Sequence, residues 1–447
     1  MGEAKRGSVA VATLGCKVNQ YESQLLKEEF AAAGYVIVGD YDQADIYIIN
    51  TCSVTNLSDR KSRQLIRKAI RNNPDCTIAV TGCFAQIKPE EIAAIPGVDI
   101  VVGTNEKNRL PAYIEEYRNE QANNAQIHIK KYEELKYYDR GKPITGMDSR
   151  TRAFIKIQEG CDRFCSYCII PYARGSSRSR ALSDIIEEAE GLVKRGFKEL
   201  VLTGINTALY GMEDGFFRDL EGCGVEIVIK AINEIPGDFR TRLGSLEPTV
   251  VDAEYAGHLL KYEKLCPHMH LSLQSGSDKI LRLMNRNYDR EGYLDIVNVL
   301  REHDPGFGIS TDIIVGFPGE EEEDFEDTVR IVKEAGFCKV HVFPYSEREG
   351  TAAAGFNQSV PSITKNKRCA ILMDVAEQTA DQFFKSCIGQ TRTVLFERYD
   401  GKTGSLEGYT DNYIRVYCRS DKSLIKEFAQ VELTKVCGDA MEGVIVK

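Results

Sequence analysis

The chain has 447 residues, a hydrophobic content of 43%, a charged content of 28% and a formal net charge of −10 at pH 7. These values describe a globular protein of roughly two to four domains, and they argue against wholesale nucleic-acid binding while allowing a local basic surface. No apolar stretch is long enough to cross a bilayer and no signal-peptide pattern opens the sequence, so we expect a cytoplasmic protein without a membrane partner, whose 14 cysteines serve metal or redox chemistry rather than disulfides.

Residues 1–115 alternate short β-branched apolar runs with helical segments. The runs SVAVATL, DIYIIN, CTIAVTG and VDIVVG are typical of parallel strands that are buried on both faces. Segments such as QYESQLLKEEFAAAG and SDRKSRQLIRKAIRNNP predict helices between them. This region is therefore predicted to form an open α/β domain of the Rossmann or flavodoxin-like kind.

The rest of the chain divides into a linker, a barrel and a small β domain. Residues 116–150 lose the periodicity and are predicted to be a linker that can carry one short strand. Residues 151–386 hold six strand candidates, AFIKIQ, ELVLTG, TRLGSL, HMHLSLQ, GISTDIIVG and KVHVFPY, which alternate with helices and precede a long closing helix. This pattern predicts a (βα)6 partial TIM barrel with its active site at the carboxyl ends of the strands. Residues 387–447 hold about five short strands, which predict a small antiparallel OB-like barrel.

Three cysteines follow the first strand of the predicted barrel. In EGCDRFCSYC, Cys161, Cys165 and Cys168 have the spacing C-x3-C-x2-C. A 4Fe–4S cluster usually takes four thiolates, so three would leave one iron open to a small molecule, as three ligands do in catalytic zinc sites. The alternative is a zinc site that a distant residue completes.

This motif, with Tyr167 before its third cysteine, resembles the radical S-adenosylmethionine (SAM) superfamily. The resemblance implies that Cys161, Cys165 and Cys168 hold a 4Fe–4S cluster whose open iron binds the amino and carboxylate groups of SAM. It also implies that reductive cleavage of SAM yields a 5′-deoxyadenosyl radical. By the same resemblance, the SAM contacts fall on Tyr167, Gly204, Ser245, Glu247, Gln274, Gly316 and Phe317.

Three further cysteines occupy equivalent places in the first domain. Cys16, Cys52 and Cys83 each follow a predicted parallel strand. Because the loops after parallel strands share one edge of the sheet, we expect these cysteines to converge on a second cluster. The alternative is that each is a small buried apolar residue.

The sequences TLGCKVNQYES, NTCSVTNLSDRKSRQ and VTGCFAQ around these cysteines resemble the N-terminal domain of the methylthiotransferases. Members of that family have this domain, a radical SAM barrel and a C-terminal TRAM domain. The resemblance implies a second 4Fe–4S cluster on Cys16, Cys52 and Cys83, whose open iron holds the sulfur to be inserted. One SAM then supplies the methyl group and another the radical, with an electron-donor protein such as flavodoxin or ferredoxin as partner.

Methylthiotransferases act on tRNA adenosines or on a ribosomal protein. Lys17-Val18-Asn19 is closest to the MtaB-like branch, which converts N6-threonylcarbamoyladenosine next to the anticodon (position 37) into its 2-methylthio derivative by removing the hydrogen at adenine C2. The branch for isopentenyladenosine more often has Gln-Met-Asn there, and the ribosomal-protein branch Pro-Lys-Asn. The resemblance thus favours the anticodon loop of tRNA. The alternatives are the other two substrates, or a metal-cluster RNA-binding protein without catalysis.

Basic residues occur at two places where RNA contact is expected. One set lies on a predicted helix and the other follows the cysteine motif of the barrel: Arg60, Lys61, Arg63, Arg67, Lys68 and Arg71, and then Arg174, Arg178 and Arg180. They are candidates for RNA phosphates, and the second set also for a carboxylate of SAM or of the threonyl group. The alternative for the helix is a solvated charged face. His268 and His270 alternate on one predicted strand and therefore face the same way, with no metal assigned to them.

Overall fold

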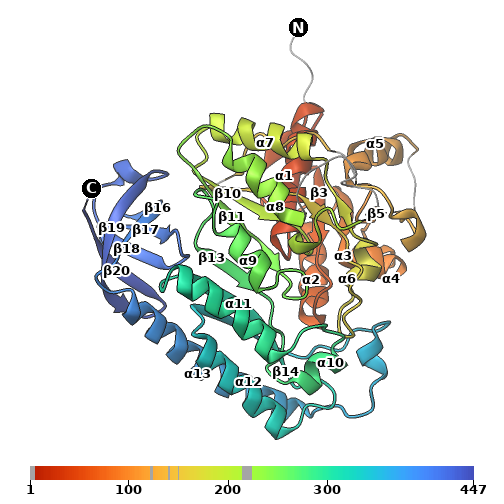
Figure 1. The fold of residues 1–447 in the computed structure, drawn as a ribbon. Helices are drawn as coiled ribbons and strands as arrows, with labels where there is room; N and C mark the ends of the chain where they lie inside the picture. The colour runs from red at the N-terminus through yellow and green to blue at the C-terminus, as the bar shows by residue number, and fades with distance from the viewer. Residues whose placement is uncertain (1–5, 121–123, 139–140, 149–150, 214–223, 447) are drawn as a thin grey trace.

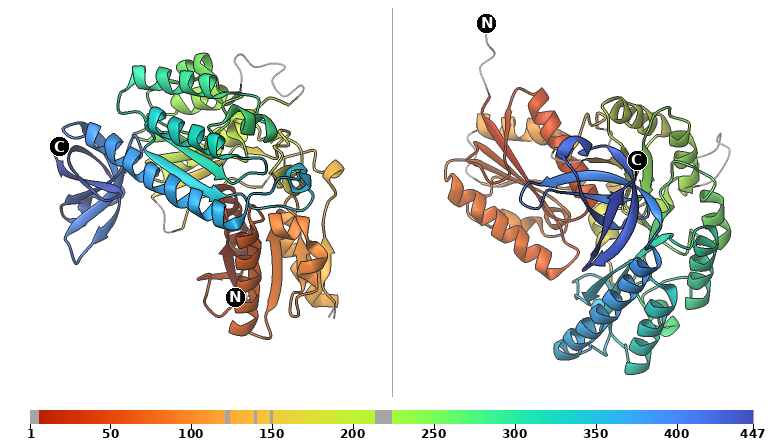
Figure 2. Two further views of the ribbon diagram at one scale, coloured as in Figure 1. Left: turned by 90° about the horizontal axis from the view of Figure 1, so that it is seen from below. Right: turned by 90° about the vertical axis from the view of Figure 1, so that its left-hand side faces the viewer.

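The computed structural model describes residues 6–120, 124–138, 141–148, 151–213 and 224–446. Figure 1 shows three parts: an N-terminal sheet with its helices, a central open barrel, and a small C-terminal β-barrel at the far end of the long helix α13 (Ser362–Ser386). Figure 2 shows the N-terminal sheet and the C-terminal barrel against different sides of the central barrel. Within these ranges, none of the helices combines the length and the apolar character that crossing a membrane requires.

The N-terminal sheet is parallel and has the order β2-β1-β3-β4-β5-β6. Its strands are β1 (Ser8–Thr13), β2 (Val36–Val38), β3 (Ile46–Thr51), β4 (Thr77–Gly82), β5 (Ile100–Val102) and β6 (Gln126–His128). The order is that of flavodoxin-like sheets, which bind ligands where neighbouring strands lead in opposite directions, here between β1 and β3. The sequence-based prediction of an open α/β domain is confirmed. β6 comes from the predicted linker and pairs with β5.

Alternate side chains of each N-terminal strand enter two separate cores. Ile46 and Ile48 belong to one and Tyr47 and Ile49 to the other, because successive side chains of a strand point to opposite faces. Helices cover both faces, which explains the continuous apolar runs. They are α1 (Lys17–Ala32), α2 (Asn56–Asn72), α3 (Cys83–Ile87), α4 (Pro89–Ala93), η1 (Lys107–Arg109), α5 (Leu110–Glu120) and η2 (Tyr132–Glu134).

The central part is a partial barrel of six βα units, as predicted. Its strands form two parallel sheets: β7 (Arg152–Lys156), β10 (Glu199–Thr203) and β11 (Arg240–Leu243), then β12 (Ser245–Leu246), β13 (His268–Leu271), β14 (Gly308–Val315) and β15 (Lys339–Pro344). β11 continues into β12 and bridges the two sheets through Thr241 and Leu265. A short hairpin of β8 (Gln158–Glu159) and β9 (Arg178–Ser179) follows the first strand.

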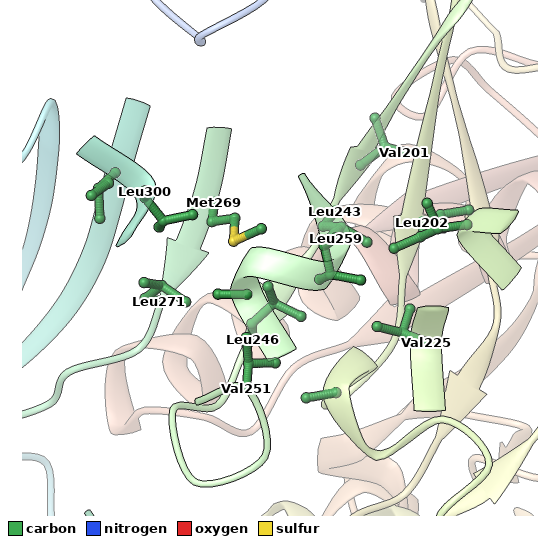
Figure 3. Close-up of a cluster of buried hydrophobic side chains, with 14 of the residues drawn as sticks. Val201, Leu202, Val225, Leu243, Leu246, Val251, Leu259, Met269, Leu271 and Leu300 are labelled. Carbon is green, nitrogen blue, oxygen red and sulfur yellow. The ribbon is translucent and has the colours of Figure 1, made fainter. Parts of the chain in front are cut away.

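Helices pack on the outside of this barrel and bury its main core. They are α6 (Ile170–Arg174), α7 (Leu182–Lys194), η3 (Thr207–Leu209), α8 (Gly224–Asn233), α9 (Ala253–Leu259), α10 (Asp278–Leu283), α11 (Arg290–His303), α12 (Glu322–Ala335), η4 (Ala352–Gly355) and α13. Figure 3 shows Leu243, Leu246, Met269 and Leu271 of the strands against Val225 and Leu300 of the helices. Each fully buried side chain of this kind stabilises the fold by about 1.5–3 kcal/mol.

The C-terminal part is a closed five-stranded barrel, as predicted, with the order β16-β17-β18-β20-β19. Its elements are β16 (Thr391–Asp400), β17 (Ser405–Thr410), β18 (Arg415–Arg419), η5 (Lys422–Leu424), β19 (Phe428–Cys437) and β20 (Ala440–Ile445). Two buried arginines attach it to the central barrel. Arg240 donates to the carbonyls of Thr393 and Tyr409, and Arg242 to those of Thr410 and Asp411.

Candidate functional site

The structure brings Cys16, Cys52 and Cys83 to one edge of the N-terminal sheet. Cys16 is the exposed N-cap residue of α1, Cys52 follows β3, and the buried Cys83 begins α3. Gly15 has φ +107°, and a Cβ on it would lie 3.1 Å from the sulfur of Cys52. The pKa of Cys52 is raised to about 11, mainly by burial and in part by the neighbouring Cys83 and Cys16. These three residues, the N-terminal triad, therefore lie close together at the β1/β3 switch point.

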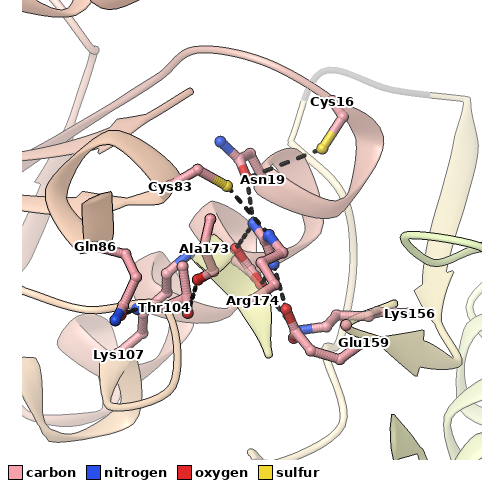
Figure 4. A network of polar contacts seen from close by, with 12 residues as sticks. Cys16, Asn19, Cys83, Gln86, Thr104, Lys107, Lys156, Glu159, Ala173 and Arg174 are labelled. Carbon is pink, nitrogen blue, oxygen red and sulfur yellow. Dashed lines mark hydrogen bonds and ion pairs between the residues drawn. The ribbon is translucent and has the colours of Figure 1, made fainter. Parts of the chain in front are cut away.

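A buried ionic network lies directly behind the N-terminal triad (Figure 4). Arg174, fully buried at the end of α6, donates from Nη1 to Glu22 at 2.8 Å and to Glu159 at 2.5 Å. Lys107 pairs with Glu22, and Lys156 pairs with both carboxylates. Although burial opposes it, these cations hold the pKa of Glu22 well below its usual range. Three cations thus face two carboxylates inside the protein.

The network has one more positive than negative charge, and its Arg174 lies against the cysteines. Nε of Arg174 donates to the sulfur of Cys83 at 3.2 Å, and its Nη2 donates to Oδ1 of Asn19 at 2.6 Å. An unbalanced buried charge is costly unless a counter-charge compensates it. Metal-bound thiolates carry negative charge and would supply that compensation. The N-terminal triad therefore fits an anionic metal–thiolate group.

The second triad, Cys161, Cys165 and Cys168, lies on the loop between β8 and α6. The loop is anchored at its centre, where Ser166 donates from its backbone N–H to Met284 O at 3.0 Å and from Oγ to Leu283 O at 2.7 Å. The pKa of Cys161 and that of Cys168 are raised to about 12, mainly by burial and in part by the neighbouring Cys165. The three half-buried cysteines thus share one environment, and we call them the barrel triad.

Charged residues from several loops of the barrel surround the barrel triad. Glu247 accepts hydrogen bonds from Asn206 at 2.6 Å and from Arg163 at 3.0 Å, and it pairs with Arg286 at 3.0 Å. Arg286 also donates to the hydroxyl of Tyr167 at 3.0 Å. Burial raises the pKa of Cys165, and the positive charge of Arg286 opposes part of this rise. Tyr167 and Glu247, both predicted from the sequence, are therefore joined by Arg286, which sequence reasoning missed.

A cavity of about 230 Å³ adjoins the barrel triad. Tyr167, Cys168 and Gln274 line it, together with residues of the N-terminal part such as Thr55. Gln274 has φ +65°, a left-handed conformation that is strained for a residue with a side chain. The structure thus brings two of the seven predicted SAM contacts, Tyr167 and Gln274, to this cavity beside a triad cysteine.

The other predicted SAM contacts lie elsewhere. Gly204 and Ser245 line a second cavity, whereas Glu247 is buried in the cluster around Arg286. Phe317 is buried in an apolar cluster that Tyr167 packs against. Gly316 has φ +70° and donates its N–H to Glu320 at 2.9 Å, and a Cβ there would lie 2.4 Å from Lys365. Gly316 and Phe317 therefore shape the turn after β14 without lining either cavity.

The second cavity has a volume of about 530 Å³ and is bounded by all three parts of the protein. Cys16 and Lys17 line it from the N-terminal part, and Tyr409 and Tyr413 from the C-terminal barrel. Its wall on β13 to β15 includes His268, His270, Ser310, Asp312, Lys339 and His341. Asp312 also lines the smaller cavity, so this residue borders both cavities. We call this second cavity the junction cavity.

The histidine expectation from sequence is met, and it points to residues that sequence reasoning missed. His268 and His270 do face the same way, and both contact Oγ of Ser310, at 3.1 and 3.0 Å. His270 pairs with Ser310 in the β13–β14 register. Polar residues at alternate positions of two predicted central strands were the signal that would have located this wall.

The predicted RNA-contacting residues separate into exposed and buried sets. On α2, Arg60, Lys61, Arg67, Lys68 and Arg71 are exposed, whereas Arg63 pairs with Glu91. Arg174, Arg178 and Arg180 are buried instead. Arg178 donates to backbone carbonyls, including that of Leu135 at 2.7 Å, and Arg180 pairs with Glu188 at 2.8 Å. The expectation that these three arginines face RNA phosphates does not hold in this structure, because intramolecular partners occupy them.

The zinc alternative finds no support in the geometry. Across the described ranges, no group of three or more His, Cys, Asp or Glu side chains is arranged to hold a single metal ion. A 4Fe–4S cluster differs from zinc because each thiolate binds a different iron atom, so its ligands need not surround one point. Three thiolates that do not surround one point are compatible with such a polynuclear group.

Comparison with known proteins places the chain in a family. Residues 8–103 match the uncharacterized protein family UPF0004, residues 155–332 the radical SAM superfamily and residues 385–446 the TRAM domain. The threonylcarbamoyladenosine tRNA methylthiotransferase MtaB of Bacillus subtilis (strain 168) is 42% identical over 98% of this chain and 96% of that protein. The tRNA-2-methylthio-N(6)-dimethylallyladenosine synthase of Clostridium tetani (strain Massachusetts / E88) is 36% identical over 98% and 96%.

A solved structure shares the fold. The radical S-adenosylmethionine methyltransferase TsrM of Kitasatospora setae superposes with a TM-score of 0.55 at 14% identity, over 88% of this chain and 79% of that one. The radical SAM match implies a 4Fe–4S cluster and SAM as cofactors. With its three matched domains in this order and relatives of this identity over almost its whole length, the chain belongs to the radical SAM tRNA methylthiotransferases, a group of transferases, and is MtaB-like.

Proposed function

We propose that this protein converts N6-threonylcarbamoyladenosine at position 37 of tRNA into its 2-methylthio derivative. The observation that carries the proposal is the junction cavity, where Cys16 of the N-terminal triad meets the barrel interior and the C-terminal barrel. Asp312 borders both this cavity and the smaller one beside Cys168. The choice of substrate is supported by the identity of 42% to a relative named for threonylcarbamoyladenosine, against 35–39% to three relatives named for dimethylallyladenosine.

In this proposal each triad holds one 4Fe–4S cluster. Cys161, Cys165 and Cys168 bind the first, and Cys16, Cys52 and Cys83 bind the second. When bound, these groups and SAM supply the radical that removes hydrogen from adenine C2 and the sulfur and methyl group that replace it. Tyr167 and Gln274 bind SAM in the smaller cavity, Arg286 and Glu247 fix the barrel loop, and Gly204 and Ser245 border the substrate.

The partners and the domain limits belong to the same proposal. We place domain limits at residues 115, 151 and 387, with the strand at 126–128 added to the N-terminal sheet. The anticodon loop of tRNA is the substrate, a protein such as flavodoxin or ferredoxin donates electrons, and the reaction takes place in the cytoplasm. The exposed cations of α2 are the proposed phosphate contacts.

Two measurements test this function. Nucleoside mass spectrometry of tRNA from a strain without this gene should show threonylcarbamoyladenosine but not its methylthio form, and the gene should restore that form. Loss of methylthiolated dimethylallyladenosine, or of a modified ribosomal protein, would identify another substrate. Anaerobically purified protein should contain about eight iron atoms per chain. Stoichiometric zinc without iron would instead support a non-catalytic RNA-binding protein.

A further inference from the structure

Two ammonium groups of the junction cavity have no partner among the residues that the structure describes. Lys17, at the start of α1, and Lys339, at the start of β15, both line the cavity. Neither side chain makes an ion pair or a hydrogen bond with any residue of the described ranges. The cavity therefore holds two positive charges that no protein carboxylate neutralises directly.

The two arginines of the same cavity differ from these lysines. Arg242 is buried and pairs with Glu199 at 2.9 Å while donating to carbonyls of the C-terminal barrel. Arg415 pairs with Asp439. Because both arginines already have partners, Arg242 attaches the C-terminal barrel and Arg415 stabilises that barrel internally. The cations that remain available to a ligand are Lys17 and Lys339.

The positive charges of both lysines affect titratable residues on the wall formed by β13 to β15. Burial is the main cause that lowers the pKa of His341, and the positive charges of Lys17 and Lys339 lower it further. Lys17 also contributes to the lowered pKa values of His268 and Asp312. The one carboxylate on this wall, that of Asp312, is held by His270 at 3.1 Å. An incoming anion would therefore meet positive potential in this cavity.

The same wall offers further hydrogen-bonding groups. His270 lies between Asp312 and Ser310, and Ser310 also contacts Nε2 of His268 at 3.1 Å. The other ring nitrogen of His268, Nδ1, is buried and has no hydrogen-bond partner. A buried polar atom without a partner costs free energy, which a ligand that pairs with it would recover. The cavity is thus built for a ligand with both an anionic group and uncharged polar groups.

We infer that Lys17 and Lys339 bind the carboxylate of the N6 substituent of the target adenosine, while His268, His270 and Ser310 bind its hydroxyl and carbamoyl groups. This inference rests on the proposed function and assigns residues to its substrate specificity. A threonylcarbamoyl group has all of these features, whereas a dimethylallyl group is an apolar hydrocarbon and would leave the polar wall unpaired. Such a site discriminates strongly, because the wrong substrate buries polar groups without partners. Because Cys16 lines the same cavity, a substituent anchored there holds the adenine beside the N-terminal triad.

The test uses the holoenzyme under anaerobic conditions and three anticodon stem-loop RNAs of one sequence. Their target adenosine has a threonylcarbamoyl group, the methyl ester of that group, which is neutral, or a dimethylallyl group. We expect the wild type to bind the carboxylate RNA at least about tenfold more tightly than the ester. Lys339→Gln and Lys17→Gln should each lower this preference by about tenfold while leaving affinity for the ester unchanged. Lys367→Gln, at an exposed position of α13, is the matched control and should change neither affinity.

Equal affinity of the wild type for acid and ester, or an undiminished preference in both variants, would overturn the inference. Iron content is measured for every variant, because Lys17 is next to Cys16. Lys339→Gln gives an independent answer, since Lys339 is adjacent to no triad cysteine. Failure of the proposed function has a different signature: the wild type would methylthiolate the dimethylallyl RNA and not the threonylcarbamoyl RNA.

Discussion

Nε of Arg174 donates a hydrogen bond to the sulfur of Cys83 at 3.2 Å, from the central barrel to the N-terminal sheet. Arg174 is the last residue of α6, the helix that begins directly after the loop of the barrel triad. At the preceding residue, Thr104 of the N-terminal part donates to the carbonyl of Ala173 at 2.9 Å. The chain segment that holds one triad therefore touches a cysteine of the other.

This contact predicts that Arg174 tunes the group that the N-terminal triad binds. Arg174→Met removes a hydrogen bond to sulfur and one buried positive charge, and both stabilise the reduced, more negative form of an iron–sulfur cluster. The reduction potential should therefore become more negative. The network keeps two lysines for its two carboxylates, so the variant stays balanced in charge. The measurement is a redox titration followed by electron paramagnetic resonance, in a background where the barrel cysteines are alanine.

Arg180→Met is the matched control for Arg174→Met. Arg180 is also buried, but it pairs with Glu188 and contacts no sulfur. This variant should lose stability without a change in the potential. An unchanged potential in Arg174→Met with a full iron content would contradict the tuning role, whereas absence of iron from the background protein would contradict the second cluster itself.

Single cysteine substitutions should separate the roles of the two triads. Cys161→Ala should abolish SAM cleavage, because the proposed SAM-binding iron is lost. Cys16→Ala should leave cleavage to 5′-deoxyadenosine intact and stop methylthio insertion. Both products are measured by liquid chromatography and mass spectrometry, and each variant should retain about four of eight irons. Methylthiolated product from Cys16→Ala would show that the N-terminal triad does not supply the sulfur.

The sequence was sufficient for the fold because strand and helix periodicities are local signals. Burial of charge is not local, and the arginines after the barrel triad show why. Arg174 and Arg178 looked like surface cations beside a cofactor, but Glu22 and Glu159 neutralise Arg174, and Glu22 lies far away in the chain. The junction cavity was missed for the same reason, since Lys17, Lys339 and Tyr413 come from three different parts. The position of β6 was not predictable either, because its pairing with β5, and not its local strand propensity, makes it a strand.

Glu199 should control the attachment of the C-terminal barrel. It is fully buried and pairs with Arg240 at 2.6 Å and Arg242 at 2.9 Å, the two arginines that bind that barrel. Glu199→Gln leaves both guanidinium groups without their counter-charge, so the free energy of unfolding should fall by about 3–5 kcal/mol. Glu397→Gln, which affects a more exposed pair with Arg152, should cost at most about 1 kcal/mol. Urea denaturation measures both, and equal losses would contradict this role of Glu199.

The same residue predicts a loss of stability in acid. Although burial opposes it, Arg242 and Arg240 hold the pKa of Glu199 far below its usual range. A carboxyl whose pKa is lower in the folded state stabilises the fold fully above its unfolded pKa, about 4.3, and loses that contribution as the pH falls toward the folded pKa. The wild type should therefore lose more free energy of unfolding than Glu199→Gln between about pH 6 and pH 3.5. Parallel pH profiles of the two proteins would exclude Glu199 as the source.

The exposed face of α2 should bind tRNA phosphates. Arg60, Arg67 and Arg71 are exposed, have no side-chain partner among the described residues, and follow a spacing of seven and four, which places them on one face of the helix. The N-terminal end of α2 is fixed close to the N-terminal triad, where Asp59 pairs with Arg348 at 2.8 Å.

The double variant Arg60→Gln/Arg67→Gln should weaken tRNA binding and reduce the slope of log K against log salt by about 2, since each phosphate contact contributes about one unit. Lys230→Gln, an exposed lysine of α8, should leave the slope unchanged. If the double variant keeps the wild-type slope in filter-binding titrations over a range of salt, these cations form a solvated helix face and the phosphates bind elsewhere.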